Sequence, residues 1–133
     1  MGQKVNPQGI RLGITSDWKS RWFSKKDLPR QLKEDIEIRE LLFKKLKTAS
    51  IGSVELERSA GAVKVIIKTA RPGIIIGRGG TGVEDIKKLI KDTFFKQKKT
   101  VLKVEIEEIK NIEENAMVIA QNVAEQLEKR LPF

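Results

Sequence analysis

Four consecutive residues, Gly77-Arg78-Gly79-Gly80, have the types and spacing expected of a loop that holds a phosphate backbone. Glycine has no Cβ, so another backbone can approach the main chain closely, and it adopts turn conformations that other residues avoid. Arg78 would add a charged donor for phosphate oxygens. A helix is expected to follow the loop, and the N-terminus of a helix attracts anions. The chemistry predicted for this segment is non-covalent binding of a polyanion.

Two functional interpretations of the loop remain open, beside a purely structural glycine turn. In a KH domain, a Gly-x-x-Gly loop joins a short helix to a second helix and clamps the backbone of about four nucleotides. Alternatively, Gly77, Gly79 and Gly82 fit the G-x-G-x-x-G pattern of a dinucleotide-binding unit, with Glu107 as the acidic residue further on.

Several features count against the dinucleotide pattern. Pro72 and Gly73 interrupt any long strand leading into the loop, and a helix and a hairpin are expected before it. The chain of 133 residues leaves little length for a doubly wound sheet, and the cofactor would not require a net charge of +9. The sequence therefore favours a KH domain.

The charge distribution supports a polyanionic partner. The formal net charge is +9, but residues 101–133 carry 4 basic and 7 acidic side chains, so the excess of positive charge lies in residues 1–100. A concentrated basic region in a small domain is typical of nucleic-acid binding, with an acidic membrane surface as the other class of partner. Within this region Lys87, Lys88 and Lys91 follow the loop and could contact RNA backbone or simply form a solvated helix face.

Residue types that are absent from the sequence narrow the possible functions. The sequence contains no Cys, His or Tyr, which argues against a disulfide, a zinc site and acid–base catalysis near neutral pH. We therefore expect no catalytic residue, no metal and no cofactor or small-molecule substrate. No apolar run approaches the ~20 residues of a membrane span. The N-terminus has neither an apolar signal core nor a myristoylation motif. These features predict a cytoplasmic protein without membrane attachment.

The elements that would position the loop can be read from the hydrophobic pattern. Residues 1–26 show no regular period and are predicted to form an extended basic arm that becomes ordered on a partner. The aromatic residues Trp18, Trp22 and Phe23 of this arm could stack on bases or attach the arm to the core. Asp27-Leu28-Pro29 predicts the start of a helix that lasts to about Lys47, with a possible break near Asp35.

The remaining chain predicts a hairpin, the glycine loop, and a helix–strand–helix sequence. Residues 51–58 and 63–68 alternate around a turn at 59–61. After the loop, Thr81 and Glu84 predict a capping box, and a third strand is expected over 102–107. Asn111 is predicted to cap a last helix whose apolar face carries Ala116, Ile119, Ala120, Val123 and Leu127. The predicted fold is α+β, with a three-stranded sheet packed against helices.

Several strings in the sequence are specific enough to indicate a family. Residues 1–7 (MGQKVNP) and 9–14 (GIRLGI), together with 69–77 (TARPGIIIG) and 106–110 (IEEIK), closely resemble the bacterial-type family of small-subunit ribosomal protein S-three. The similarity extends over essentially all 133 residues. The resemblance implies a type II KH domain, in which the first helix and the hairpin precede the Gly-x-x-Gly unit. The implied domains are the arm, residues 1–26, and the KH domain with its final helix, residues 27–133.

The same resemblance implies the function. Members of the family are structural components of the head of the small ribosomal subunit, near the path by which messenger RNA enters. The implied partners are small-subunit ribosomal RNA and neighbouring head proteins, and messenger RNA could be a further one. The alternative functions are a free-standing KH protein that binds single-stranded RNA and a dinucleotide-binding enzyme. The RNA-binding residues expected from the loop, the arm and the adjoining positions are Gly77, Arg78, Gly79, Gly80, Lys4, Asn6, Pro7, Arg11, Arg71, Lys87 and Lys88.

Two departures from the family pattern affect these expectations. The loop carries Arg78-Gly79 where the family often has lysines, which implies a weaker or differently oriented clamp. The family also normally continues into a basic stretch and a second α/β domain that this sequence does not contain. The residues that face the entering messenger RNA belong to that further domain, so the sequence supports no such role here.

Overall fold

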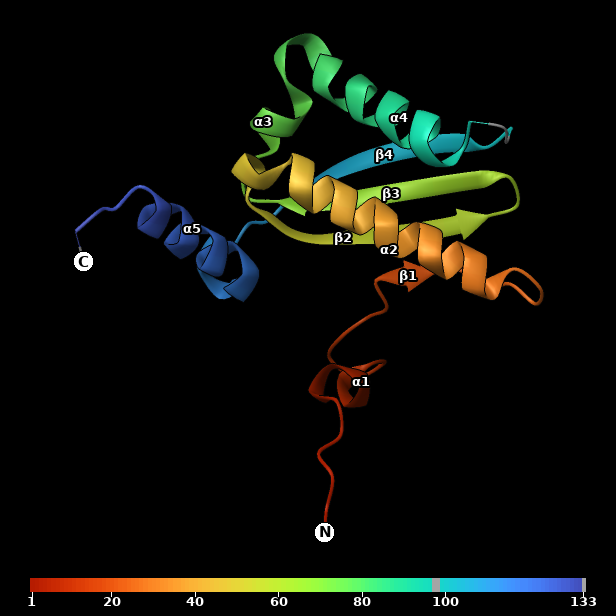
Figure 1. Ribbon diagram of the computed structural model, residues 1–133, viewed down its shortest axis with the longest axis horizontal. Coiled ribbons are helices and arrows are strands. Elements are labelled where there is room, and N and C mark those ends of the chain that lie inside the picture. The colour runs from red at the N-terminus through yellow and green to blue at the C-terminus, as the bar shows by residue number, and fades with distance from the viewer. Residues whose placement is uncertain (97–98, 133) are drawn as a thin grey trace.

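The computed structural model describes residues 1–96 and 99–132. Figure 1 shows its helices and strands in chain order. They are α1 (Pro7–Arg11), β1 (Ser20–Arg21), α2 (Leu28–Lys45), β2 (Ile51–Ser59), β3 (Ala62–Thr69), α3 (Pro72–Ile76), α4 (Thr81–Phe94), β4 (Val101–Glu108) and α5 (Ala116–Glu128). Three 3-10 turns, at Lys47–Ala49, Arg78–Gly80 and Ile112–Glu114, connect some of these elements.

The sheet is mixed and has the strand order β1-β2-β3-β4. The hairpin strands β2 and β3 are antiparallel, whereas β1 joins β2 and β4 joins β3 in parallel. The three predicted strands are confirmed. The structure adds a fourth, because Ser20 and Arg21 of the predicted arm pair with Leu56 and Glu57. A strand of two residues is too short to show the alternation from which strands are predicted.

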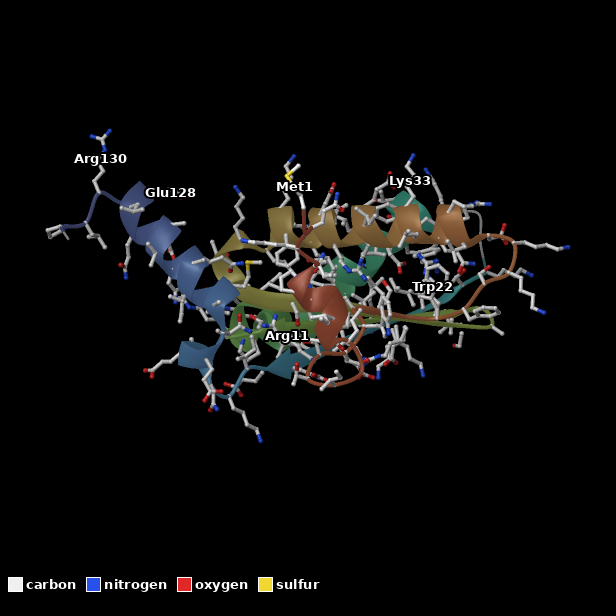
Figure 2. The ribbon with its side chains drawn as sticks, turned by 90° about the horizontal axis from the view of Figure 1, so that it is seen from below. Met1, Arg11, Trp22, Lys33, Glu128 and Arg130 are labelled. Carbon is white, nitrogen blue, oxygen red and sulfur yellow. The ribbon has the colours of Figure 1, made fainter. Side chains whose placement is uncertain are left out.

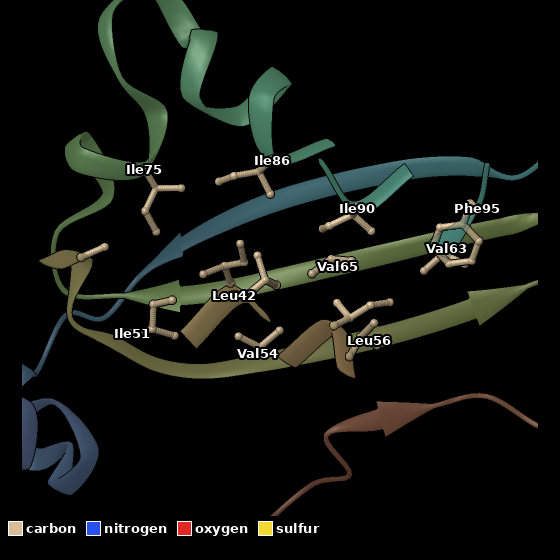
Figure 3. Packing of buried hydrophobic residues seen from close by; sticks show 13 residues of the cluster. Leu42, Ile51, Val54, Leu56, Val63, Val65, Ile75, Ile86, Ile90 and Phe95 are labelled. Atoms are coloured by element: carbon tan, nitrogen blue, oxygen red, sulfur yellow. The ribbon is translucent and has the colours of Figure 1, made fainter. Parts of the chain in front are cut away.

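One face of the sheet carries the hydrophobic core. Helices α2, α3 and α4 cover this face. Figure 3 shows Ile75 of α3 and Ile86 and Ile90 of α4 above the strand side chains, with Leu42 of α2 among them. The cluster contains Ile38, Leu42, Ile51, Val54, Leu56, Val63, Val65, Ile67, Ile75, Ile86, Ile90 and Phe95, together with Ala49. The alternation in β2 and β3 places these apolar side chains inward and the charged ones outward, as predicted. The core thus fixes α3 and α4, the two helices that flank the glycine loop.

The opposite face of the sheet is a ladder of paired charges. Lys64 lies 2.9 Å from Glu105, and this hydrogen bond raises the pKa of the lysine. Lys68 pairs with Glu55 at 2.5 Å, and Arg21 reaches the same glutamate at 2.8 Å. Since acidic and basic groups are matched across neighbouring strands, this face has little excess positive charge to attract RNA.

Three local predictions are wrong. α2 runs through Asp35 without a break, because the Asp35 side chain is buried and bonded to other elements. Thr81 is the first residue of α4, and its hydroxyl donates to the carbonyl of Arg78, so it forms no capping box with Glu84. The last helix is capped by Asn115, whose side chain accepts from Met117 and Val118, while the predicted cap residue Asn111 precedes a 3-10 turn.

The predicted apolar face of the last helix does not pack on the core. Ile119, Val123 and Leu127 are 43%, 49% and 56% exposed, and only Val118 of α5 is buried. The side chain of Gln121 instead connects α5 to the sheet by donating to the carbonyl of Ile51. Figure 1 shows α5 projecting from the end of the sheet where β2 begins. Apolar periodicity predicted the helix but could not say which of its sides faces the domain.

Candidate nucleic-acid interface

The glycine loop connects α3 to α4 with a backbone that only glycine adopts readily. Gly77, Gly79 and Gly80 have φ angles of 69°, 66° and 81°. A Cβ at Gly79 or Gly80 would meet no heavy atom within 4 Å, so the space beside these two residues is open. The order short helix, Gly-x-x-Gly loop and longer helix is the one that the KH interpretation predicts.

Gly82 has a different role from the loop glycines. A Cβ at this position would lie 2.3 Å from the carbonyl oxygen of Ile75, so glycine allows the first turn of α4 to approach the end of α3. The residues before the loop form a helix, α3, where a dinucleotide-binding unit requires a strand. The G-x-G-x-x-G spacing therefore results from a turn and a close helix contact, and the dinucleotide interpretation is wrong.

Positive groups lie in the loop and further along α4. Arg78 is exposed at the tip and takes part in no ion pair within residues 1–96 and 99–132. The loop precedes the N-terminus of α4, a helix of 14 residues, where the helix dipole and the free amides attract anions. Lys88 is exposed and Lys87 half-buried on α4 itself. The loop thus combines main-chain space, a helix N-terminus and the charge of Arg78, while Lys87 and Lys88 lie about two turns further along α4.

Arg71 lies just before α3, beside α5. It lines a hollow of about 400 Å³ together with Asn122, Glu125 and Lys129. The pKa of Glu125 is lowered chiefly by its hydrogen bond to Lys129, and the charge of Arg71 adds a smaller contribution. The structure therefore places Arg71 next to a carboxylate of α5.

The arm residues predicted to bind RNA lie in and before α1. Asn6 is the N-cap of α1, with its Oδ1 accepting from the amides of Gln8 at 2.9 Å and Gly9 at 3.2 Å. Pro7 begins the helix, and Arg11 donates to the Pro7 carbonyl at 3.0 Å. Lys4 is exposed.

Figure 1 shows α1 on the opposite side of the sheet from α3 and the glycine loop. In Figure 2, Arg11 lies on the face of the molecule from which the N-terminal segment extends. The structure therefore does not bring the arm residues together with the loop, and the two groups form separate candidate contacts.

A buried polar cluster that the sequence analysis missed attaches the arm to the domain. Asp35 Oδ2 accepts from Ser20 Oγ at 2.8 Å and from Trp22 Nε1 at 2.7 Å, while Asp35 Oδ1 accepts from Arg58 Nε at 2.8 Å. Arg39 adds bonds to the Ser20 hydroxyl and to the Lys19 carbonyl, and burial lowers the pKa of this arginine. Asp35 is fully buried, so the cluster joins the arm, α2 and β2 in the interior.

A signal for this cluster was present in the sequence. Asp35 stands at helical spacing from Ile38 and Leu42, on the buried side of α2, and Arg58 continues the inward alternation of Val54 and Leu56. An acid and a base that both fall on apolar faces are expected to pair, because burying either charge alone is costly.

The three aromatic residues of the arm have different surroundings. Trp22 is half-buried and anchors the arm through Asp35, whereas Trp18 and Phe23 are 61% and 83% exposed. The attachment role therefore belongs to Trp22, and the other two rings remain accessible.

Within the described part of the chain, no group of three or more Asp, Glu, His or Cys side chains is arranged to hold a metal ion. The helices of that part also include none that is long and apolar enough to span a membrane.

Comparison with known proteins agrees with this geometry. Residues 37–114 match the KH domain family. The chain is 46% identical over 133 residues to "Small ribosomal subunit protein uS3" of Bacillus cytotoxicus, covering 100% of this chain and 59% of that protein. It is 46% identical to the protein of the same name from Coxiella burnetii, covering 57% of it, and 47% identical to that of Desulfitobacterium hafniense, covering 59%.

The chain thus spans somewhat more than half the length of these curated relatives. The matched KH segment contains α3, the glycine loop and α4, the second half of α2, and all of β2, β3 and β4. On this match, which covers more than half of the sequence, the chain belongs to the KH domain family.

Proposed function

We propose that this chain is a structural RNA-binding component of the small ribosomal subunit and has no catalytic activity. The observation that carries the proposal is the loop Gly77–Gly80, which combines positive φ angles and open space with the N-terminus of α4. Similarity to uS3 proteins over the whole chain supports the ribosomal assignment.

In this proposal the loop binds the sugar-phosphate backbone. Gly79 and Gly80 leave room for a phosphate, the first amides of α4 donate to its oxygens, and Arg78 neutralises its charge. Lys87 and Lys88 extend the positive surface along α4. Arg71 adds a positive charge before α3, although the nearby carboxylate of Glu125 offsets part of it.

The arm forms a second, separate contact with RNA. Lys4 and Arg11 supply the charge, whereas Asn6 and Pro7 hold α1 in the conformation that presents them. We assign these roles because Asn6 caps α1 and Pro7 begins it. Asn6 and Pro7 would therefore affect RNA binding only through the conformation of α1. We propose residues 1–26 as the arm and 27–133 as the KH domain, with β1 as the point of attachment.

The ribosomal partners follow from the resemblance to the uS3 family. We propose small-subunit ribosomal RNA as the main partner, neighbouring proteins of the subunit head as protein partners, and a cytoplasmic location on the ribosome. Messenger RNA is proposed only as an alternative target of the same RNA-binding loop.

Co-sedimentation tests the proposal. The chain is mixed with small subunits depleted of their own uS3 protein, and the bound fraction is measured for the parent, Gly79→Asp and Gly79→Ala. Aspartate places a carboxylate where a phosphate should lie, so binding should be greatly weakened by Asp and less by Ala. Circular dichroism verifies that both variants remain folded.

Each outcome has a distinct meaning. If the folded Asp variant co-sediments like the parent, the loop is not the clamp. If the parent binds single-stranded RNA but not the subunits, the chain is a free-standing KH protein and the ribosomal assignment is wrong.

A further inference from the structure

A second hollow lies at the opposite end of the domain from the glycine loop. It measures about 530 Å³ and is lined by Trp22, Phe23, Arg30, Arg58, Gly61 and Phe95, among others. We call it the distal pocket. Its volume falls within the range of roughly 300–1,000 Å³ that is typical of small-ligand sites. Figure 2 places Trp22 far from Glu128 and Arg130 at the other end of the molecule.

The interior of the distal pocket suits a flat, uncharged ring. The guanidinium of Arg58 lies 5.9 Å from the ring centres of both Trp22 and Phe95. Its charge is already balanced by Asp35 at 2.8 Å and by Glu34 at 3.0 Å. Phe95 is buried and only 9% of the Arg58 side chain is exposed, so an incoming ring would contact mainly Trp22 and Phe23, with the charge of Arg58 already balanced.

Phe23 stands at the mouth of this pocket with 83% of its surface exposed. Trp22, its neighbour in sequence, is held by Asp35 through a bond of 2.7 Å, so the backbone next to Phe23 is fixed. A rigidly placed, solvent-exposed ring is the usual platform for an unpaired base in single-stranded RNA recognition.

Cations lie close to the pocket in the sequence. Arg30 lines the pocket and pairs with Glu34, and Lys25 and Lys26 stand between the lining residues Ser24 and Asp27. Lys25 and Lys26 are exposed. This charge is complementary to phosphates on either side of a base inserted into the pocket.

Helix α4 links the distal pocket to the glycine loop. It begins at Thr81, after the loop, and ends at Phe94, next to the lining residue Phe95. Its 14 residues span about 21 Å at 1.5 Å per residue. Lys88 and Lys91 are exposed along it, so a strand leaving the loop meets cations on the way to the pocket.

We propose that the distal pocket receives an unpaired base of the RNA held by the glycine loop, with Phe23 as its stacking platform. This inference rests on the proposed function, because it assigns a second contact to the same RNA. The distal pocket would add a contact that depends on a base, whereas the glycine loop binds only the sugar-phosphate backbone.

The test compares RNA with and without bases. The dissociation constant Kd is measured for a single-stranded RNA long enough to extend beyond α4, and for an oligomer of equal length with abasic sites. Phe23→Ala should raise the Kd for the RNA about 5- to 150-fold, the range for loss of one stacked base. It should leave the Kd for the abasic oligomer unchanged. The fold should survive, since Phe23 is exposed.

Trp18→Ala is the matched control, because Trp18 is an exposed aromatic of the same arm that lines a different hollow. Its Kd values should equal those of the parent. A second control is an RNA of about four nucleotides, which fills only the clamp and should not respond to Phe23→Ala.

The results separate the two proposals. If Gly79→Asp weakens RNA binding while Phe23→Ala does not, the glycine loop binds RNA as proposed, but the distal pocket does not bind a base. An equal loss for the abasic oligomer, or an equal loss with Trp18→Ala, also overturns the inference. If the parent chain binds neither oligomer, the proposed function itself fails.

Discussion

Glycines within six residues of one another serve three different purposes. Gly77 has φ 69° and ψ −177°, a region in which essentially only glycine is found. Gly79 has φ 66° and ψ 18°, which other residues can adopt at a cost of roughly 1–2 kcal/mol. Gly82 is required because a Cβ would collide with the Ile75 carbonyl. A change to alanine should therefore have a different effect at each position.

We predict that the free energy of unfolding falls most for Gly82→Ala, less for Gly77→Ala and least for Gly79→Ala. The first variant must separate α3 from α4, and the second forces a side chain into a backbone conformation that costs about 1–3 kcal/mol. The third has open space and should lose roughly 1–2 kcal/mol. Urea denaturation measures all three, and an equal loss at Gly79 and Gly82 would contradict the observed packing.

Asp35 is the most heavily bonded acidic residue of the interior. It accepts from Ser20, Trp22 and Arg58 and is fully buried. Because Arg58 is itself nearly buried, with 9% of its side chain exposed, removal of the carboxylate leaves a buried cation with only Glu34 to balance it. Such a loss is much larger than that of a surface pair.

We predict that Asp35→Asn lowers the free energy of unfolding by about 3–5 kcal/mol. The control is Glu37→Gln on the same helix, whose pair with Lys33 is long at 3.8 Å and exposed. That change should stay within about 0.5 kcal/mol. A small effect of Asp35→Asn in thermal or urea unfolding would show that the cluster does not stabilise the fold.

At the scale of elements, the arm is attached at one short segment. β1 pairs with β2, and the amide of Leu56 donates to the carbonyl of Lys19 at 2.9 Å. Before β1 the arm has only α1, a helix of five residues with no buried side chain. A helix of this length is marginal by itself, so residues before β1 are expected to become ordered only on RNA.

Amide exchange separates the two parts of the arm. In the free chain, amides of residues 2–16 should exchange quickly, whereas the Leu56 amide should be protected by its bond to Lys19. Trp22→Ala removes one of the anchors to Asp35 and should speed up exchange at Leu56, while Trp18→Ala should not. Strong protection throughout residues 2–16 without RNA would contradict partner-dependent ordering.

The same elements show how far the sequence determines the structure. Long periodic segments, such as α2, β2 and β3, were predicted to within a few residues because many side chains repeat the pattern. The glycine loop was located by residue type alone, since few residues other than glycine occupy positive φ angles. Both predictions depend on residue types and spacings that can be read directly from the sequence.

The errors concern contacts between distant segments. β1 could not be predicted from two residues, because its partner Leu56 lies 36 positions away and the attachment needs Asp35 and Trp22 together. The orientation of α5 depends on the hydrogen bond from the Gln121 side chain to the Ile51 carbonyl. Hydrophobic periodicity does not indicate a contact of this kind. The cap at Asn115 was missed because Asn111 offered an equally good local signal four residues earlier.

For the whole molecule, the charge has a clear arrangement. The outer face of the sheet pairs its lysines with glutamates, for example Lys64 with Glu105 and Lys68 with Glu55. Among the described residues, exposed cations without such partners include Arg78 in the loop and Lys88 and Lys91 on α4, and others lie on the arm, such as Lys4 and Lys25. The positive charge is therefore divided between the loop with α4 and the arm, and the account requires that RNA binds the loop through its phosphates.

The dependence of RNA affinity on salt tests this central claim most directly. For single strands, log K should fall linearly with log salt by about 0.7 for each neutralised phosphate. A clamp that holds about four nucleotides predicts a slope of roughly −2 to −3 for a short RNA. Gly79→Asp should weaken binding and make the slope shallower. A flat salt dependence, or a slope unchanged in the Asp variant, would contradict backbone binding by the glycine loop.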